Sequence, residues 1–206
     1  MTTPKTVVFD LGKVLVDFDY AIAVGRIVSR AKMPIGELAH FINHSPLFSR
    51  YETGLVTSEE FYEAICAATG FHGTFEQFGS FFADIFTEIA PMVQLHGTLC
   101  QKGIPTYAFS NTNDLAVRHI RHSFPFFTRF AGCILSYEHK AMKPDPRLYE
   151  VVERESGRRG AEILYFDDRP ENVAAGAARG WQAILHESPK NSIAAVEKLG
   201  LLNHST

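Results

Sequence analysis

The sequence lacks the features that would place it in a membrane, on nucleic acid or outside the cell. No apolar run approaches the ~20 residues that a membrane span requires. Lysine and arginine form no cluster and the formal net charge is −3, which argues against nucleic acid as the main partner. Residues 1–6 lead directly into an apolar run without the apolar core of a signal peptide. We therefore expect a cytoplasmic protein that acts on neither membrane nor nucleic acid.

Cysteine is also scarce. The only three, Cys66, Cys100 and Cys133, lie far apart in apolar contexts. Their odd number and their spacing match no disulfide framework, metal site or redox motif. Buried, reduced thiols are therefore expected, which agrees with a cytoplasmic location.

The remaining composition is that of an ordinary globular protein, with 46% hydrophobic and 21% charged residues. A chain of 206 residues can bury one good core and a smaller second unit. The organisation of the chain must therefore be inferred from local patterns.

Residues 7–15, with the sequence Val-Val-Phe-Asp-Leu-Gly-Lys-Val-Leu, organise the rest of the chain. The uninterrupted apolar run before Asp10 predicts a strand that is buried on both faces. In an open parallel α/β sheet, ligands bind beyond the carboxyl ends of the strands, so Asp10 stands where chemistry takes place. Gly12 allows the backbone to turn sharply and to approach a ligand closely.

Residues 16–90 have the pattern of an all-helical insertion. Helical periodicity covers residues 20–30, 34–42, 57–69 and 75–88. Thr57 and Glu60 have the spacing of a capping box at the start of the third helix. Around residues 48–54 the pattern breaks into a turn, where we expect substrate selection and where Glu52 is a candidate substrate-binding residue.

From residue 91 onward the chain alternates between helix and strand, as parallel α/β sheets do. Strands are predicted at residues 104–109, 132–135, 163–166 and 182–185. Together with the first strand they predict an α/β fold, in which residues 1–15 and 91–206 form one parallel-sheet core around the inserted residues 16–90.

Polar residues follow several of these strands or open the loops behind them. They are Asp10, Ser110, Asn111, Lys143, Asp167 and Asp168. The carboxyl ends of parallel strands lie at one edge of a sheet, so these side chains are expected to converge there. Singly, each has an ordinary role as helix cap, turn residue or surface charge. The complete set, in this order along the chain, indicates a single functional site.

The chemistry of this set suits phosphoryl transfer. A carboxylate such as Asp10 can attack phosphorus and form an aspartyl-phosphate. Ser110 and the N–H groups that open the following helix can donate to phosphate oxygens, and Lys143 can neutralise their charge. Asp10 with the acidic pair Asp167 and Asp168 forms a cluster of hard oxygen ligands suited to Mg²⁺.

At these residues the sequence resembles the haloacid dehalogenase-like hydrolase superfamily. The matching motifs are residues 9–15, 110–112, 143–145 and 166–168, so the resemblance covers nearly the whole chain. It implies a Rossmann-like core and identifies residues 16–90 with the α-helical cap domain of one subclass.

The resemblance also implies roles for single residues. Asp10 would be the nucleophile, and Ser110 and the catalytic Lys143 would bind the phosphate. Asn111, next to Ser110 in the same motif, is a further candidate substrate-binding residue. Mg²⁺ would be held by Asp10, Asp168 and the backbone carbonyl of Gly12, with Asp167 behind them or in contact through water.

The first motif is similar to that of bacterial phosphatases acting on glucose 1-phosphate and related sugar phosphates. We therefore expect a Mg²⁺-dependent phosphatase of a small phosphorylated metabolite, as a monomer or homodimer. Residues 124–127, Phe-Pro-Phe-Phe, fit either a dimer contact or a loop packed on the core.

One position departs from the family pattern. Where the family usually has a second aspartate, which protonates the leaving group and later activates water, this chain has Gly12. Loss of such an acid–base group typically costs ~10²–10⁴-fold in rate. Three explanations stay open: an easy leaving group such as an anomeric phosphate, a substitute among Asp17, Asp19 and Glu52, or water alone.

Two other functions compete with the phosphatase. Metal-independent 2-haloacid dehalogenases of the same superfamily use the same nucleophile, here Asp10, and also lack the second aspartate; Arg50 would then bind the substrate carboxylate. A chain without its acid–base group is also compatible with a non-catalytic protein that binds a phosphorylated ligand. The pair Asp167 and Asp168 favours Mg²⁺ and phosphate.

Overall fold

The computed structural model describes residues 2–202, in which five parallel strands form one sheet in the order β5-β4-β1-β6-β7. The strands are β1 (Thr6–Phe9), β4 (Thr106–Ser110), β5 (Gly132–Leu135), β6 (Ile163–Asp167) and β7 (Gln182–Leu185). The central strand β1 pairs with β4 on one side and β6 on the other. The expected Rossmann-like α/β fold is confirmed, and Asp10 lies where the central strand ends.

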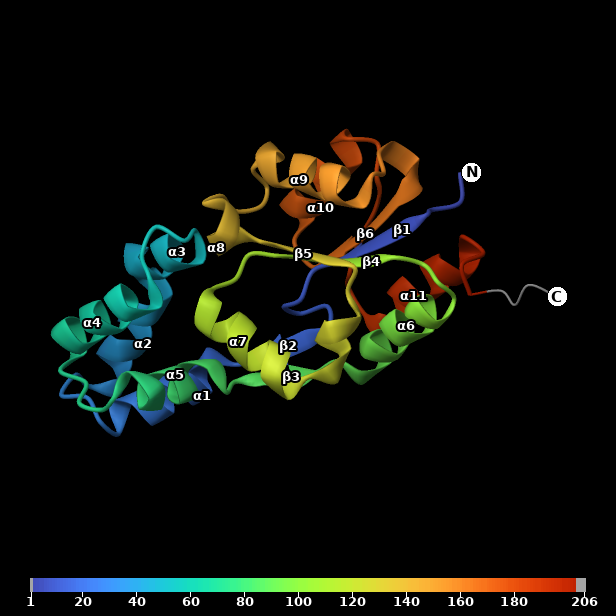
Figure 1. Cartoon of the computed structure of the whole chain (residues 1–206). Coiled ribbons are helices and arrows are strands. Elements are labelled where there is room, and N and C mark those ends of the chain that lie inside the picture. The colour runs from blue at the N-terminus through green and yellow to red at the C-terminus, as the bar shows by residue number, and fades with distance from the viewer. Residues whose placement is uncertain (1, 203–206) are drawn as a thin grey trace.

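Helices cover both faces of the sheet (Figure 1). One face, that of Val7 and Phe9, packs against α6 (Ala90–Gln101), α7 (Asp114–Ser123) and α11 (Pro189–Lys198). The other, that of Val8, packs against α9 (Pro146–Ser156) and α10 (Pro170–Ala178). Short 3₁₀ helices, η1 (Pro125–Arg129) and η2 (Gly160–Glu162), lead into β5 and β6. Because alternate side chains of β1 enter different cores, every position of the strand is buried.

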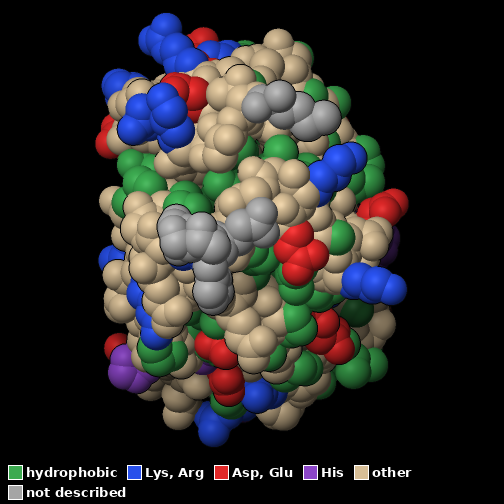
Figure 2. All heavy atoms as spheres, turned by 90° about the vertical axis from the view of Figure 1, so that its right-hand side faces the viewer, with side chains coloured by type: hydrophobic (Ala, Val, Ile, Leu, Met, Phe, Trp, Pro, Cys, Tyr) green, Lys and Arg blue, Asp and Glu red, His purple; other side chains and the backbone are tan. Residues whose placement is uncertain are grey.

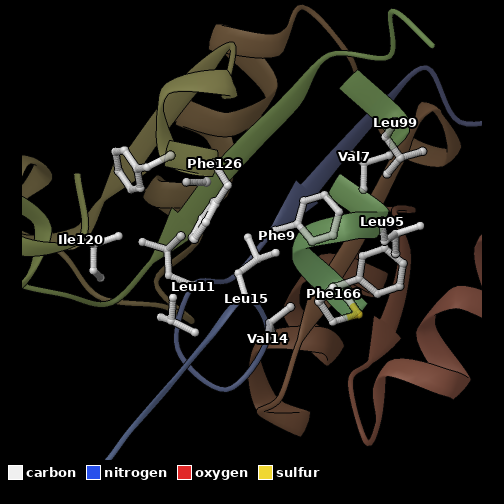
Figure 3. Close-up of a cluster of buried hydrophobic side chains, with 14 of the residues drawn as sticks. Val7, Phe9, Leu11, Val14, Leu15, Leu95, Leu99, Ile120, Phe126 and Phe166 are labelled. Carbon is white, nitrogen blue, oxygen red and sulfur yellow. The ribbon is translucent and has the colours of Figure 1, made fainter. Parts of the chain in front are cut away.

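The loop after β1 is anchored in the first of these cores. Figure 3 shows Leu11, Val14 and Leu15 among the same buried side chains as Phe9 and Phe166. The rings of Phe9 and Phe166 stack with their centroids 5.5 Å apart. Apolar contacts on both sides of Asp10 therefore hold that residue in place. Two phenylalanines of the 124–127 run, Phe126 and Phe127, are buried in this cluster as well, so the packed-loop interpretation holds for them.

The helices α1–α5, here called the helical unit, have a hydrophobic core of their own at one end of the sheet (Figure 1). They are α1 (Tyr20–Val28), α2 (Ile35–His44), α3 (Pro46–Glu52), α4 (Ser58–Thr69) and α5 (Phe75–Ala83). The core is rich in aromatic rings, and Tyr51 and Phe61 stack at 4.3 Å. The predicted capping box of Thr57 and Glu60 is present.

Residues 16–90 are not all helical, contrary to the sequence prediction. Two short strands, β2 (Val16–Phe18) and β3 (Phe86–Glu88), pair antiparallel where the chain leaves and re-enters the core. Because Phe86 pairs with Phe18, the helix predicted for residues 75–88 ends at Ala83. Three-residue strands are too short for a periodic signal, and their pairing partners are far apart in the chain.

The turn predicted at residues 48–54 is mostly helix. Helix α3 runs through Glu52, with Pro46 in its first turn and the Ser45 hydroxyl accepting a hydrogen bond from the Leu47 N–H. Both are ordinary helix-start signals. Only the segment just beyond Glu52 turns, at Gly54, which has a φ of +70°. A short helix that the sequence did not predict, α8 (Ser136–His139), faces this turn.

The end of α3 is held against the core at α8. The Ser136 hydroxyl donates to the carbonyl oxygen of Glu52 at 2.6 Å and accepts from the Thr112 N–H at 2.9 Å. A Cβ added at Gly54 would lie 2.0 Å from the carbonyl oxygen of Tyr137. The helical unit and the core thus approach each other backbone to backbone here, and only glycine fits.

His96 is a polar group inside the core. Its side chain is fully buried, with Nε2 2.9 Å from the Thr106 hydroxyl and the ring 4.4 Å from that of Phe130. Its Nδ1 has no partner among the described residues. Burial and, to a smaller extent, the charge of the nearby Arg129 guanidinium lower the pKa of His96 to about 4.

Within residues 2–202 no helix combines the length and apolar character needed to cross a membrane. Figure 2 views the end of the molecule opposite the helical unit, where acidic and basic side chains are mixed with scattered hydrophobic ones. The three cysteines are free thiols, and each is half-buried rather than fully buried as expected.

We expect Gly54→Ala to destabilise the protein more than Gly103→Ala. Both glycines have a positive φ, +70° and +73°, but nothing lies within 4 Å of a Cβ at residue 103. The control, Gly103→Ala, should therefore be destabilised only by the strain of alanine in the left-handed conformation, about 1–2 kcal/mol. Denaturant unfolding of both variants measures the difference; equal losses would show that Gly54 does not touch the core.

We also expect His96 to make stability depend on pH. The unfolded histidine has a pKa of 6.5 and the folded one about 4, so between these values only the unfolded chain binds the proton. The stability contributed by a neutral His96 is complete above about pH 6.5 and is lost as the pH falls toward 4.

The measurement is the free energy of unfolding of wild type and of His96→Gln across this range. As the pH falls, the free energy of unfolding of wild type should decrease relative to that of His96→Gln. The decrease should be at most about 1.4 kcal/mol per pH unit. Parallel curves would contradict the assignment.

Candidate active site

A cavity of about 180 Å³ opens at the carboxyl ends of β1, β4 and β6, beneath the helical unit. The sequence-predicted residues that line it are Asp10, Gly12, Glu52, Ser110, Asn111, Lys143 and Asp168. Asp167 lies directly beside them, fully buried. The structure therefore brings together every residue of the predicted site, including the one from the helical unit.

Lys143 is the centre of the site. Its ammonium donates to the Asp167 carboxylate at 2.6 Å and to the Phe109 carbonyl oxygen at 2.7 Å, and lies 3.2 Å from Oδ2 of Asp10. The residue is almost completely buried. Each of the three ammonium protons thus faces an oxygen, so the hydrogen-bonding capacity of this buried group is used completely.

Asn111 holds Lys143 in position. Its side-chain oxygen accepts from the Lys143 N–H at 2.7 Å, and its amide donates to the Lys143 carbonyl oxygen at 3.0 Å. Both ends of the Asn111 amide are therefore engaged, although the sequence predicted that this residue binds substrate. The neighbouring Ser110 hydroxyl has only a 3.4 Å contact with the Asn111 carbonyl oxygen and is available to a ligand in the cavity.

Asp10 is oriented by its own loop. The Leu11 N–H donates to Oδ1 of Asp10 at 2.7 Å, and Oδ2 faces Lys143. Burial raises the pKa of the Asp10 carboxyl; the Lys143 ammonium opposes that shift, and the charges of Asp167 and Asp168 add to it. One ammonium therefore does not fully balance the three carboxylates.

Asp167 is fully engaged in hydrogen bonds. Its oxygens accept from Lys143, from the Tyr165 hydroxyl, from the Arg169 N–H and from the Asn172 amide. Burial would raise the pKa of Asp167, but the Lys143 charge and these hydrogen bonds outweigh it and lower the pKa. Asp167 therefore stays ionised and fixes the groups around it.

The donor set fits a divalent cation. One carboxylate oxygen from each of Asp10, Asp167 and Asp168 lies within 4.8 Å of the others. The buried side-chain oxygen of Asn172 has no hydrogen-bond partner among the described residues, and its amide is oriented by the bond to Asp167. Burial and the Asp167 charge raise the pKa of the half-buried Asp168. Carboxylate and amide oxygens are hard ligands of the kind that Mg²⁺ prefers.

The candidates for the missing acid–base group are placed very differently. Asp17 is exposed and paired with Lys13, and Asp19 caps α1 by accepting from the Ala21 N–H. Neither lines the cavity, whereas Glu52 does. Arg50, the candidate for binding a haloacid carboxylate, is exposed and also outside the cavity lining.

Glu52 enters the cavity from the end of α3. Its carboxylate makes no hydrogen bond or ion pair to any described residue, while its carbonyl oxygen is fixed by Ser136. Burial raises the pKa of Glu52 to about 7; the Arg169 guanidinium lowers it and the Asp10 charge raises it.

Sequence reasoning missed half of the cavity wall. The missed residues are Lys13, Phe18, Tyr20, Phe48, Met142, Arg169 and Asn172. Asn172 and Arg169 follow the acidic pair closely, and Asn172 lies in the first turn of α10, so their proximity to Asp168 was a usable signal. The aromatic residues come from the helical unit and β2, and nothing in their spacing indicates that they face a site.

The pattern that defines haloacid dehalogenase-like hydrolases matches residues 4–180. The chain is 23% identical over 190 residues to a D-ribitol-5-phosphate phosphatase of Bacteroides thetaiotaomicron, covering 89% of this chain and 92% of the relative. It is 27% identical over 182 residues to a sesquiterpene phosphatase of Aspergillus oryzae, covering 87% and 88%. A haloacid dehalogenase family enzyme of Bacteroides thetaiotaomicron, solved with magnesium and inorganic phosphate, shares the fold with a TM-score of 0.74 at 22% identity, covering 88% of this chain and 93% of that one. The protein belongs to the haloacid dehalogenase-like hydrolase family.

Proposed function

We propose that the protein is a Mg²⁺-dependent phosphatase of small phosphate monoesters that works through an aspartyl-phosphate on Asp10. The observation that carries the proposal is the arrangement of Lys143 between Asp10 and Asp167, with Asp168 and the unpartnered oxygen of Asn172 beside them. Two relatives that the chain matches over most of its length are named phosphatases, which supports the same reaction.

Each residue of the site has a separate role in this reaction. Oδ2 of Asp10 attacks phosphorus, and water then hydrolyses the resulting aspartyl-phosphate. Lys143 orients Asp10 and supplies positive charge beside the transferred group, and the Ser110 hydroxyl binds an oxygen of that group. Asp10, Asp168, the Gly12 carbonyl oxygen and the Asn172 side chain would hold Mg²⁺, with Asp167 behind them. When bound, the metal supplies positive charge against the phosphate oxygens.

The cavity favours a compact leaving group. Its volume of about 180 Å³ lies below the ~300–1,000 Å³ typical of pockets for drug-sized ligands. Phe18, Tyr20 and Phe48 form an apolar wall, while Glu52 and Arg169 are polar groups at the same cavity. A sugar or polyol phosphate, with an apolar C–H face and several hydroxyl groups, matches both features.

Residues 16–90, which comprise the helical unit with β2 and β3, would act as a cap. This cap contributes one side of the cavity and would have to move for a substrate to enter, a gating role common for lids. The antiparallel pair β2–β3 joins the helical unit to the core and is the place where such a movement would be taken up.

We expect phosphate release from sugar and polyol phosphates to require Mg²⁺ and Asp10. Chelation should abolish turnover reversibly, and Asp10→Asn should reduce kcat at least 10³-fold while the far-ultraviolet spectrum stays unchanged, because the amide is isosteric but no nucleophile. A colorimetric phosphate assay measures both.

The same samples should be assayed for halide release from 2-haloacids. Halide release that survives chelation would contradict the proposal in favour of a dehalogenase. Wild-type protein that binds phosphate esters but releases neither product would favour a binding protein.

Mg²⁺ binding itself should depend on Asp168 and Asn172. We expect Asp168→Asn to weaken Mg²⁺ binding at least tenfold in calorimetry without substrate, because a ligand charge is lost, and Asn172→Ala to weaken it by about 10–100-fold. Asp17→Asn, exposed and outside the cavity, is the matched control and should bind as wild type does. Unchanged binding by both site variants would place the metal elsewhere.

A further inference from the structure

The space beside Gly12 is occupied. A Cβ added at residue 12 would lie 2.9 Å from Cε1 of Phe18. The Phe18 ring is itself held between neighbours, 5.3 Å from the Tyr20 ring and 6.0 Å from that of Phe86, with the Lys13 ammonium 4.6 Å from its centroid. A side chain at residue 12 would therefore require the Phe18 ring to shift, and the loop after β1, with glycine at this position, places no second carboxylate in the cavity.

The acid–base group must then come from another element, if a side chain supplies it. Among the carboxylates of residues 2–202, those that line the cavity are Asp10, Glu52 and Asp168. Asp10 is the proposed nucleophile, and Asp168 belongs to the proposed metal site. Glu52 remains, with its carboxylate unbonded and its backbone held by Ser136.

We propose that Glu52 is the general acid and base of the reaction, carried by the helical unit instead of the loop after β1. This role rests on the proposed phosphatase activity and deepens it. Because the group arrives from the helical unit, the site is complete only when α3 lies against the core at α8.

The steps balance as follows. Oδ2 of Asp10 forms a bond to phosphorus while the bond from phosphorus to the leaving oxygen breaks, and that oxygen takes the proton of the Glu52 carboxyl. The Glu52 carboxylate then accepts a proton from water as the water oxygen attacks the aspartyl-phosphate. Breakage of the bond between phosphorus and Asp10 releases inorganic phosphate and restores the Asp10 carboxylate and the Glu52 acid.

The test compares two substrates of wild type and Glu52→Gln: p-nitrophenyl phosphate, whose leaving group needs no proton, and D-ribitol 5-phosphate, whose leaving alkoxide does. We expect the variant to lose ~10²–10⁴-fold in kcat/KM on the polyol ester and less than about tenfold on the nitrophenyl ester. On the latter, the variant should also show a burst of one nitrophenolate per active site, because hydrolysis of the aspartyl-phosphate has lost its base.

The control is Glu63→Gln, an exposed carboxylate on α4 of the same helical unit, which should behave as wild type. Glu52→Ala assayed with added acetate is a second variant, in which a free carboxyl group entering the vacated space should restore turnover. Thermal unfolding of every variant checks that the fold is intact.

Equal losses on both esters without a burst, or no loss at all, would overturn the role of Glu52 while leaving the phosphatase proposal standing. Absence of phosphate release from any ester by wild type would overturn both, and the wild-type assay identifies that case before any variant is made.

Discussion

The ammonium of Lys143, buried between Asp10 and Asp167, is the interaction on which the rest of the site depends. A buried charge is costly unless it is paired and fully hydrogen-bonded. Here the third proton is satisfied by the Phe109 carbonyl oxygen, and Asn111 holds the lysine backbone from both sides. The ends of β1, β4 and β6 are thereby tied together through one side chain.

This triad leaves an excess of negative charge in a small volume. The four donors to Asp167 stabilise its ionised form, whereas burial raises the pKa of Asp10 and of Asp168. A divalent cation at this point would favour the ionised form of both carboxylates. Asp10 can attack only when it is ionised. The positive charge of the proposed metal would therefore also favour the reactive form of the proposed nucleophile.

The helical unit supplies residues to the cavity and is held in a defined position against the core. The end of α3 is held to α8 by the close contact of Gly54 with Tyr137, and to the loop after β4 through the Ser136 hydroxyl. Glu52 is the last residue of α3, so its position in the cavity follows directly from these contacts. Glu52 and two of the three aromatic residues of the cavity wall, Tyr20 and Phe48, thus come from the same helical unit.

The sequence by itself determined the sheet and the convergence of Asp10, Ser110, Lys143 and Asp167, because apolar runs ending in polar residues define parallel strands whose carboxyl ends must lie at one edge. Tertiary structure alone decided that β2 pairs with β3 and that α3 continues through Glu52, since both depend on partners far along the chain. It also separated Glu52 from Asp17 and Asp19, which the sequence left equivalent. The direction of a side chain depends on the packing around it, as the Phe18 ring beside Gly12 shows.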